Sequence, residues 1–376
     1  PEFSGEWDSF KLVELGKFIG GGTPSSSNLS FWTGSIPWIS SSDIKEDNIN
    51  NISISRYITE DAIEKSATKY CPAPVILIVS RVGVGKVALS HTSLCTSQDF
   101  CNIIDIKCHP VFLSYNLLRT MKRKSREVQG TSIKGITSDE LQKIRVFIPK
   151  NKDEQNKISN LLTLLDERIV TQNKIIEDLK KLKCAIIEKL YSKIQGKEYS
   201  YGQLFDVVNE RNKQMEYSNI LSASQEKGMV NRDDLNLDIQ FERSNINTYK
   251  IVRKGDYVIH LRSFQGGFAF SDKLGVCSPA YTILRPNSLL EYSYLSYYFT
   301  SRRFIKSLII VTYGIRDGRS INVEEWLNMK VVIPSKEHQL HTLNVLKRID
   351  DKVENEEKYA TCLSNQKQYL LRQMFI

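Results

Sequence analysis

The first residues to consider for chemistry follow an apolar run, where Gly83, Gly85 and Ala88 have the G-x-G-x-x-A spacing of a dinucleotide-binding turn. That turn needs a helix after the glycines, whereas the residues from Lys86 onward alternate like a strand. A Walker phosphate loop needs Ser or Thr after the lysine, where Val87 stands. The sequence therefore argues against a nucleotide site.

The other patterns that could support catalysis or metal binding are equally weak. The chain contains no Pro-Pro pair, so the Asp-Pro-Pro-Tyr type motif of amino-methyltransferases is absent. Asp43-Ile-Lys45 and Asp105-Ile-Lys107 resemble the end of a nuclease motif, but such triplets arise readily by chance and neither recurs in the second half. The cysteine spacing matches no zinc module. We predict a non-catalytic chain with no metal or cofactor of its own.

The cysteines and apolar runs predict the compartment. Seven cysteines without a C-x-x-C pair fit a reducing cytoplasm better than a disulfide framework. No apolar run approaches the length needed to span a bilayer, and no signal-peptide pattern opens the chain. We therefore expect a cytoplasmic protein with no membrane partner.

Basic side chains offer a different chemistry, the binding of phosphate. The formal net charge of +9 favours polyanions. Glycine-flanked polar loops at 130–136 and 314–320 could approach a duplex and offer donors to base edges. The DNA contacts predicted from these features are Arg81, Lys86, Lys122, Arg123, Ser132 and Lys134 in the first half, and Arg262, Gln265, Arg302, Arg303, Arg316 and Arg319 in the second. The alternative for each residue is an ordinary surface role.

These residues must be positioned by a duplicated unit, because the chain repeats itself. A heptad-like spacing of apolar residues recurs 184 residues later, so that Leu162 matches Leu346. Two polar interruptions, Gln172 and Lys183, recur as Glu356 and Lys367. The predicted coiled-coil seam is Leu162, Leu165, Ile169, Ile176, Leu179, Ile186 and Leu190 in one helix, and Leu346, Ile349, Val353, Leu363, Leu370 and Met374 in the other.

The repeat predicts the domain organisation and the fold class. We expect α+β domains at 1–150 and 197–334, each followed by a long helix, at 151–196 and 335–376. Apolar runs predict strands at 75–79, 103–106 and 257–259, and the stretch 113–121 predicts a short helix.

The long helices predict how the two domains are held. A helix of about forty residues rises roughly 60 Å, and its apolar stripe must be covered by a partner. The simplest partner is the other helix running antiparallel, which would give a pseudo-two-fold molecule with one domain at each end of a strut. Homodimerisation through the helices is the alternative.

Several segments also resemble the specificity subunits of type I restriction-modification systems. The resemblance is carried by Leu15 to Ser25, Phe31 to Asp43, Gly130 to Ile136, and Ile148-Pro149 with Glu154-Gln155 leading into Leu165 to Ile169. It adds three expected DNA contacts within the opening segments, Thr23, Ser25 and Ser40. The second domain departs from the pattern, because it lacks the Gly-Gly-Thr-Pro and Ile-Pro-Trp elements.

The resemblance implies a function without catalysis. Each target recognition domain would read one half of a bipartite, asymmetric DNA target, and the helices would fix the gap between the halves. Two modification subunits carrying S-adenosylmethionine, and restriction subunits using ATP, would be the partners. The alternative from another class is a coiled-coil scaffold that displays two protein-binding domains.

Overall fold

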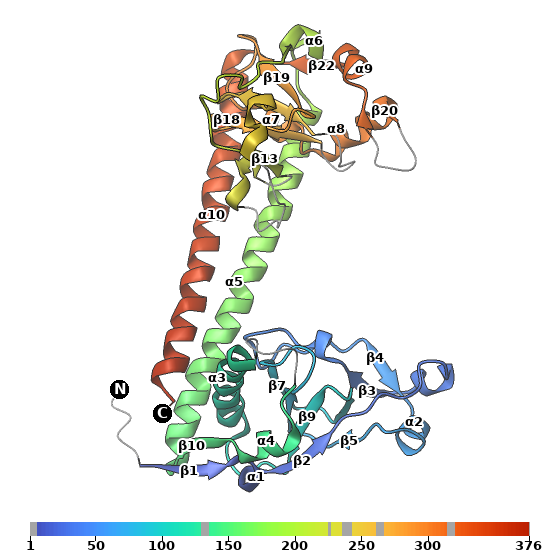
Figure 1. The fold of residues 1–376 in the computed structure, drawn as a ribbon, viewed down its shortest axis with the longest axis vertical. Helices are drawn as coiled ribbons and strands as arrows, with labels where there is room; N and C mark the ends of the chain where they lie inside the picture. Colours follow the sequence, from blue (N-terminus) through green and yellow to red (C-terminus); the bar gives the residue numbers. More distant parts are fainter. Residues whose placement is uncertain are drawn as a thin grey trace. The chain divides into compact units, whose positions relative to one another are not determined.

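The computed structural model describes residues 6–128, 135–224, 227–234, 243–260, 267–313 and 320–375. The chain forms two compact units, one of residues 1–173 with 358–376 (unit 1), and one of residues 174–357 (unit 2). Both units mix helices with mainly antiparallel strands (Figure 1). The predicted α+β class is therefore confirmed.

Unit 1 contains ten strands among its described residues. They are β1 (Trp7–Lys11), β2 (Lys17–Gly20), β3 (Ile36–Ile39), β4 (Arg56–Ile58), β5 (Tyr70–Cys71), β6 (Val75–Val79), β7 (Val87–Ser90), β8 (Leu94–Thr96), β9 (Phe100–Ile104) and β10 (Arg145–Pro149). Its shorter helices are α1 (Leu12–Leu15), α2 (Glu60–Glu64), α3 (Pro110–Val128) and α4 (Ser138–Lys143), with 3-10 helices η1 (Leu29–Trp32) and η2 (Ser41–Asp43).

Unit 2 contains twelve strands in the part of the chain that the structure describes. They are β11 (Lys197–Ser200), β12 (Phe205–Val208), β13 (Leu221–Ser224), β14 (Gly228–Asn231), β15 (Lys250–Val252), β16 (Tyr257–Ile259), β17 (Phe268–Phe270), β18 (Gly275–Cys277), β19 (Thr282–Pro286), β20 (Thr312–Tyr313), β21 (Ser320–Ile321) and β22 (Lys330–Ile333). Its shorter helices are α6 (Tyr201–Leu204), α7 (Tyr294–Tyr298), α8 (Arg302–Ser307) and α9 (Val323–Asn328), with 3-10 helices η3 (Arg232–Asp234), η4 (Arg243–Thr248) and η5 (Leu308–Val311).

The two units share a core topology. A four-stranded antiparallel sheet of order β2-β9-β6-β7 in unit 1 matches the order β12-β19-β16-β17 in unit 2. In both, a separate strand pair joins the start of the domain to the strand before its long helix, β1 with β10 and β11 with β22. The units differ in their remaining strands, since unit 1 has the sheet β4-β3-β8-β5 whereas unit 2 has the pairs β13-β14, β15-β18 and β20-β21. The repeat thus preserves the core, while the second sheet varies.

The two long helices are α5 (Lys152–Ser192) and α10 (Lys336–Gln373), and each contributes to both units. Contacts between them run antiparallel within each unit. In unit 1 the Arg168 guanidinium lies 5.6 Å from the Tyr359 ring, and in unit 2 Lys180 forms an ion pair of 2.7 Å with Glu357. All thirteen residues of the predicted seam are buried or half-buried.

Each domain core is completed by the end of a long helix. In unit 1, Met374 and Phe375 beyond α10 pack with Phe112 of α3, whose ring centroid lies 5.2 Å from that of Phe375. In unit 2, Ile187 and Tyr191 of α5 join the core beneath α7. Because burial of such side chains is the main stabilising contribution, each helix end is anchored in a domain.

The individual elements largely follow their sequence patterns. The strands predicted at 75–79 and 257–259 are β6 and β16, and the alternating residues after Gly85 form β7. The helix predicted at 113–121 is longer, because α3 runs from Pro110 to Val128. Proline fits the first turn of a helix, where no N–H is needed. None of the described helices is long and apolar enough to cross a membrane.

Candidate nucleic-acid interface

The segment 16–43 folds into loops that lock together. The Trp38 indole is buried and donates a hydrogen bond of 3.0 Å to the Gly22 carbonyl oxygen. The Thr68 hydroxyl donates to the same oxygen at 2.9 Å. A Cβ atom on Gly22 would lie 2.2 Å from the Ala67 carbonyl oxygen, so only glycine fits this close approach. The Gly-Gly-Thr-Pro and Ile-Pro-Trp stretches are therefore parts of one local structure.

The predicted contacts Thr23 and Ser25 are exposed on these loops. The Thr23 hydroxyl donates to the Gln98 side-chain oxygen at 2.7 Å, and the hydroxyls of Ser25 and Ser27 lie 2.8 Å apart. The Trp32 indole donates to the Ser25 carbonyl oxygen at 3.1 Å, which holds the loop against η1. Both predicted hydroxyls are accessible and their backbone is fixed.

Ser40 is engaged by its neighbours. Its backbone N–H donates to Asp43 at 2.8 Å, and its hydroxyl oxygen accepts from Arg56 at 2.6 Å. Arg56 also forms an ion pair with Asp43, and its guanidinium lies 4.6 Å from the centre of the Trp38 ring. The planar guanidinium is thus held in one orientation by a carboxylate and an aromatic face. Arg56 is a candidate contact that the sequence did not predict.

Arg81 is exposed and lines a surface hollow of about 800 Å³ together with Gln98. The described chain resumes at Gly135, beside Arg81, within the glycine-flanked loop at 130–136 that was predicted to contact DNA. The Ile136 N–H donates to the Ser80 carbonyl oxygen at 2.8 Å, and a Cβ atom on Gly135 would lie 2.5 Å from that oxygen. The hollow therefore combines an arginine and an amide, two side chains able to read base edges, next to the C-terminal end of that loop.

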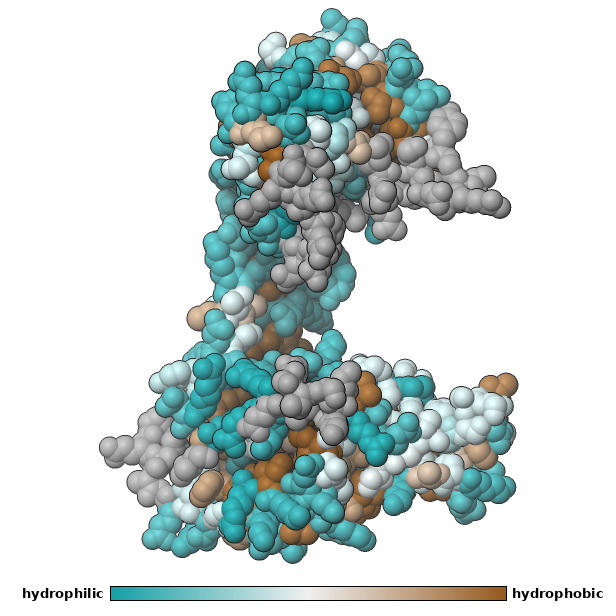
Figure 2. All heavy atoms as spheres, viewed as in Figure 1, coloured by the Kyte–Doolittle hydropathy of each residue, from teal (hydrophilic) through white to brown (hydrophobic). Residues whose placement is uncertain are grey.

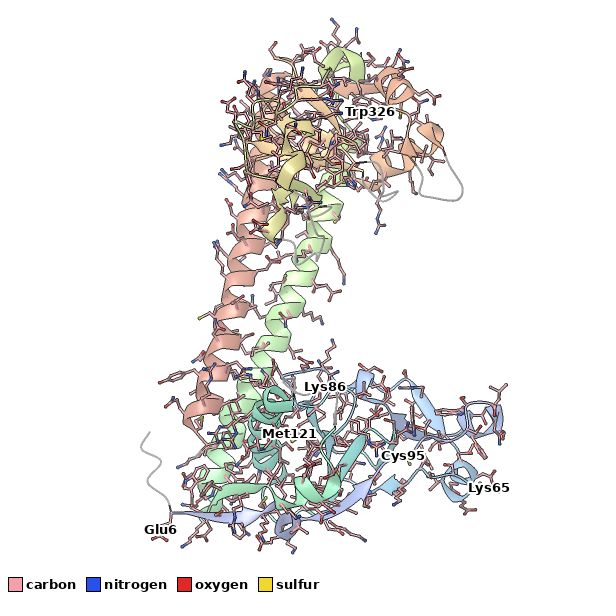
Figure 3. All side chains as sticks on the ribbon, in the orientation of Figure 1. Glu6, Lys65, Lys86, Cys95, Met121 and Trp326 are labelled. Atoms are coloured by element: carbon pink, nitrogen blue, oxygen red, sulfur yellow. The ribbon has the colours of Figure 1, made fainter. Side chains whose placement is uncertain are left out.

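Three further predicted contacts of unit 1 are described: Lys86 lies beside η2, and Lys122 and Arg123 lie on α3. The Lys86 ammonium, labelled in Figure 3, donates to the Ser41 carbonyl oxygen at 3.1 Å and so joins β7 to η2. Lys122 forms an ion pair with Asp47, whereas Arg123 is exposed. Lys86 and Lys122 thus already have partners, and Arg123 is accessible.

In unit 2, the predicted residues Arg302 and Arg303 begin α8 and face the end of α5. The Arg302 backbone N–H donates to the Glu188 carboxylate at 2.5 Å, and the Arg303 guanidinium donates to the Ser192 carbonyl oxygen at 3.4 Å. Both arginines are exposed. The predicted contacts Ser132, Lys134, Arg262, Gln265, Arg316 and Arg319 lie outside the described residues.

A buried polar cluster joins both long helices to the first domain. The Lys367 ammonium of α10 forms an ion pair with Asp166 of α5 and donates to the Asp47 carbonyl oxygen. The Tyr115 hydroxyl of α3 donates to Asp166 at 2.8 Å. Both charged side chains are almost fully buried, at 2% and 3% exposure. Desolvation therefore lowers the pKa of Lys367 and raises the pKa of Asp166, against their mutual attraction.

The same cluster recurs in unit 2 with the helices exchanged. Lys183 of α5 forms an ion pair with Asp350 of α10, and the Tyr297 hydroxyl donates to Asp350 at 2.7 Å. These side chains are more exposed, at 28% for Lys183 and 36% for Asp350. The polar interruptions Lys183 and Lys367 of the predicted seam are therefore the cations of two matching clusters.

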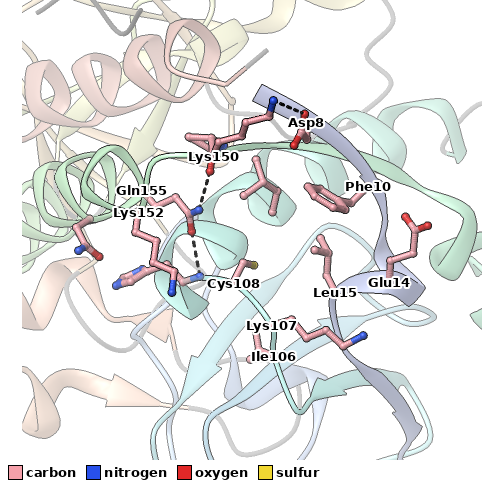
Figure 4. A pocket seen from close by; sticks show the side chains of 14 residues that line it. Asp8, Phe10, Glu14, Leu15, Ile106, Lys107, Cys108, Lys150, Lys152 and Gln155 are labelled. Atoms are coloured by element: carbon pink, nitrogen blue, oxygen red, sulfur yellow. Dashed lines mark hydrogen bonds and ion pairs between the residues drawn. The ribbon is translucent and has the colours of Figure 1, made fainter. Parts of the chain in front are cut away.

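A second matching contact fixes the start of each long helix. The Gln155 side chain accepts from the His109 backbone N–H at 3.1 Å and donates to the Pro149 carbonyl oxygen at 2.8 Å, at the edge of a hollow of about 670 Å³ (Figure 4). In unit 2 the Gln339 side chain accepts from the Glu291 backbone N–H at 2.7 Å. Gln155 and Gln339, which occupy matching positions of the repeat, therefore position the helices on their domains.

The sequence did not predict Arg56 or Gln98 as candidate DNA contacts, because each is hydrogen-bonded to a residue far away in the chain. Arg56 meets Ser40 across 16 positions, and Gln98 meets Thr23 across 75. Neither spacing has a helical or strand period that could signal a shared face. Within the described parts of the chain, no group of three or more His, Cys, Asp and Glu side chains is placed to hold a metal ion.

Comparison with known proteins gives a consistent picture. Residues 4–181 match the family model described as the type I restriction modification DNA specificity domain. The chain is 30% identical over 213 residues to the type I restriction enzyme MjaIX specificity subunit of Methanocaldococcus jannaschii, covering 54% of this chain and 48% of that protein. It is 34% identical over 169 residues to the EcoR124I/EcoR124II specificity subunit of Escherichia coli, covering 43% and 41%. The matches thus span about half the length of these relatives.

Solved structures resemble the whole chain in fold. One belongs to a study of complex assembly and conformational transition in the type I R-M system, with a TM-score of 0.63, 15% identity, and coverage of 99% of this chain and 97% of that chain. Another is the type I restriction-modification S subunit from M. genitalium, with a TM-score of 0.54, 16% identity, and coverage of 100% and 97%. At these identities the likeness shows a shared fold.

Proposed function

Because this chain belongs to the family of type I restriction-modification specificity subunits, we propose that it reads a bipartite, asymmetric DNA target with one recognition domain for each half. The observation that supports this most strongly is the internal repeat. Each unit has a sheet of the same strand order and a matching Lys-Asp-Tyr cluster between domain and helices. Two similar domains with different loops and a different second sheet suit two unlike half-sites.

The candidate contacts fall into two groups by their chemistry. Lys and Arg on helix ends suit phosphates, which fix the orientation of a protein on the duplex, whereas side chains in loops and hollows suit base edges. In the first half, Arg81, Gln98 and Arg56 are the candidates for reading bases. In the second half, we propose that Arg316 and Arg319 read bases and that Arg302 and Arg303 contact phosphates.

Partner subunits would supply the chemistry that follows recognition. We propose that two modification subunits, which carry S-adenosylmethionine, and ATP-dependent restriction subunits assemble on this chain. Exposed apolar side chains on the part of α5 that belongs to unit 1 support a docking surface for them. These are Leu161 at 42% and Leu164 at 64% exposure. Figure 2 shows the helical surface as mainly hydrophilic with apolar side chains among it, and exposed apolar positions of this kind favour a protein partner.

Replacing Arg81 by alanine is expected to relax base preference only in the first half-site. Loss of a bidentate contact to a base costs about 1–3 kcal/mol of discrimination. The matched variant is Arg319→Ala, which should relax only the second half-site. Selection of bound sequences from a randomised duplex pool, with the full chain and its modification partner, measures both preferences at once.

Two results of this selection would count against the proposal. A wild-type complex that recovers no split motif would refute bipartite reading. Equal relaxation of both half-sites by Arg81→Ala would contradict independent readout by the two domains.

Replacing Leu164 by lysine is expected to weaken capture of the modification subunit about tenfold or more, because burial of a leucine in an interface contributes about 1.5–3 kcal/mol. Ile310→Lys is the control, since Ile310 is 70% exposed on η5, away from α5 in sequence. Titration of labelled modification subunit onto each variant measures the affinity. Unchanged capture by Leu164→Lys would place the docking surface elsewhere.

A further inference from the structure

The last turns of α3 and α10 enclose a small basic hollow in unit 1. Its volume is about 240 Å³. No carboxylate belongs to the described lining, which is Arg119, Thr120, Lys122, Arg123, Arg126, Gln368, Leu371 and Arg372. We call it the α3–α10 hollow. It contains five cationic side chains, and three of them, Arg123, Arg126 and Arg372, are exposed.

Helix geometry explains why these cations share one place. Arg119, Lys122, Arg123 and Arg126 are three or four residues apart, so they lie on one face of α3. Leu371 is only 3% exposed and belongs to the domain core, which fixes this turn of α10 beside α3. The tertiary packing therefore brings the cations of two helices together.

Two features of the described structure offset part of the positive charge of the hollow. Each helix C-terminus carries roughly half a negative charge, so the ends of α3 and α10 together offset about one of the cations. The ion pair of Lys122 with Asp47 offsets a second. Burial lowers the pKa of Arg119, and repulsion by the nearby charge of Arg123 lowers it further. An anion in the hollow would relieve this repulsion.

The repeat shows that unit 2 lacks the same arrangement. The position that matches Arg372 is Glu188, whose carboxylate accepts a hydrogen bond from the backbone of Arg302. The position that matches Arg119 is Phe299, a buried core residue. At these two positions unit 1 has cations that unit 2 lacks. The other three cations of the hollow are matched in unit 2 by Arg302, Arg303 and Lys306.

We propose that the α3–α10 hollow binds phosphate groups of the DNA backbone and gives the first half-site additional sequence-independent affinity, beyond what Arg302 and Arg303 would give the second half-site. This inference rests on the proposed DNA-reading function. Guanidinium groups match phosphate oxygens bidentately, and several converge here. The hollow also lies next to the predicted reading loop in the chain, because α3 ends at Val128 just before it. A phosphate held there would set the position of the duplex against the loop.

The salt dependence of binding tests this inference. The variant Arg123→Gln/Arg372→Gln removes one cation from each helix, and its control Lys347→Gln/Arg348→Gln removes two exposed cations from α10 outside the hollow. Loss of two phosphate contacts lowers the slope of log affinity against log salt by about 1.8. The ratio of wild-type to variant DNA affinity should then fall roughly tenfold between about 50 and about 200 mM salt. The control should keep the wild-type slope.

The measurement uses the full chain with its modification partner and two short duplexes, each of which contains one half-site and lacks the phosphates of the other. The slope change should persist with only the first half-site present and vanish with only the second. An unchanged slope would overturn the inference, as would loss of modification-subunit capture without any change in DNA binding, which would assign the hollow to an acidic protein surface. A wild type without sequence preference would instead refute the proposed function, while the slopes would still decide the role of the hollow.

Discussion

Replacing Lys367 by methionine is expected to destabilise unit 1 by about 3–5 kcal/mol, because it leaves the buried Asp166 carboxylate without its cation. The matching variant in unit 2, Lys183→Met, should cost less than about 1 kcal/mol, since that ion pair is partly exposed and solvent screens it. Urea unfolding followed by tryptophan fluorescence measures the difference. Three of the four tryptophans, Trp7, Trp32 and Trp38, lie in unit 1.

A double variant separates the loss of a partner from the loss of the charge pair itself. Asp166→Asn/Lys367→Met removes both charges and leaves an amide oxygen to accept from the Tyr115 hydroxyl. Replacement of a buried ion pair by neutral groups is often close to neutral in stability, so most of the loss should be recovered. Equal destabilisation by Lys367→Met and Lys183→Met would contradict the role of burial in this cluster.

Inserting four residues after Asn173 of α5 is expected to change the gap between the two half-sites and leave the bases read unchanged. Four helical residues add about 6 Å of rise and about 40° of net rotation, which corresponds to a gap longer by one or two base pairs. Binding to the original target should fall about a hundredfold or more, because one domain loses several base contacts worth about 1–3 kcal/mol each. Methylated-site mapping of cells that express the complex measures the new gap.

A control variant that keeps the wild-type length of α5 shows whether the insertion acts by changing the length of this helix. Replacing the exposed residues Asn173, Lys174, Glu177 and Asp178 by alanine alters the same part of α5 without lengthening it, and it should keep the original gap. An insertion variant that also keeps the original gap would rule out that the length of the helices sets the gap between the half-sites.

The sequence alone was sufficient for the duplicated organisation and the helical elements. The heptad-like spacing depends on local helical geometry, and so α5 and α10 could be placed within a few residues of their ends. The apolar strand at 75–79 was equally readable. The boundaries of α3 were less accurate, since its basic last turns, unlike its buried face, carry no apolar period.

The candidate contacts were harder to predict than the elements. Arg81 was predicted as a DNA contact from the repeat, whereas Gln98, which lines the same hollow, was not. Arg56 was missed because it begins β4, whereas its partners Ser40 and Asp43 belong to the turn of η2. Arg81 and Gln98 lie in loops without a period, and Arg56 begins a strand of three residues, so spacing along the chain gives no sign of which side chains meet.

Residue types and spacing by themselves determined that this chain is built from two copies of one unit and that Lys183 and Lys367 interrupt an apolar seam. Only the tertiary structure decided why they do so. Lys367 meets Asp166 across 201 positions, and Arg372 of α10 lines the same hollow as Arg123 of α3. Periodicity reports which face of a helix is apolar, whereas the pairing of charges depends on which elements pack together and how deeply they exclude water.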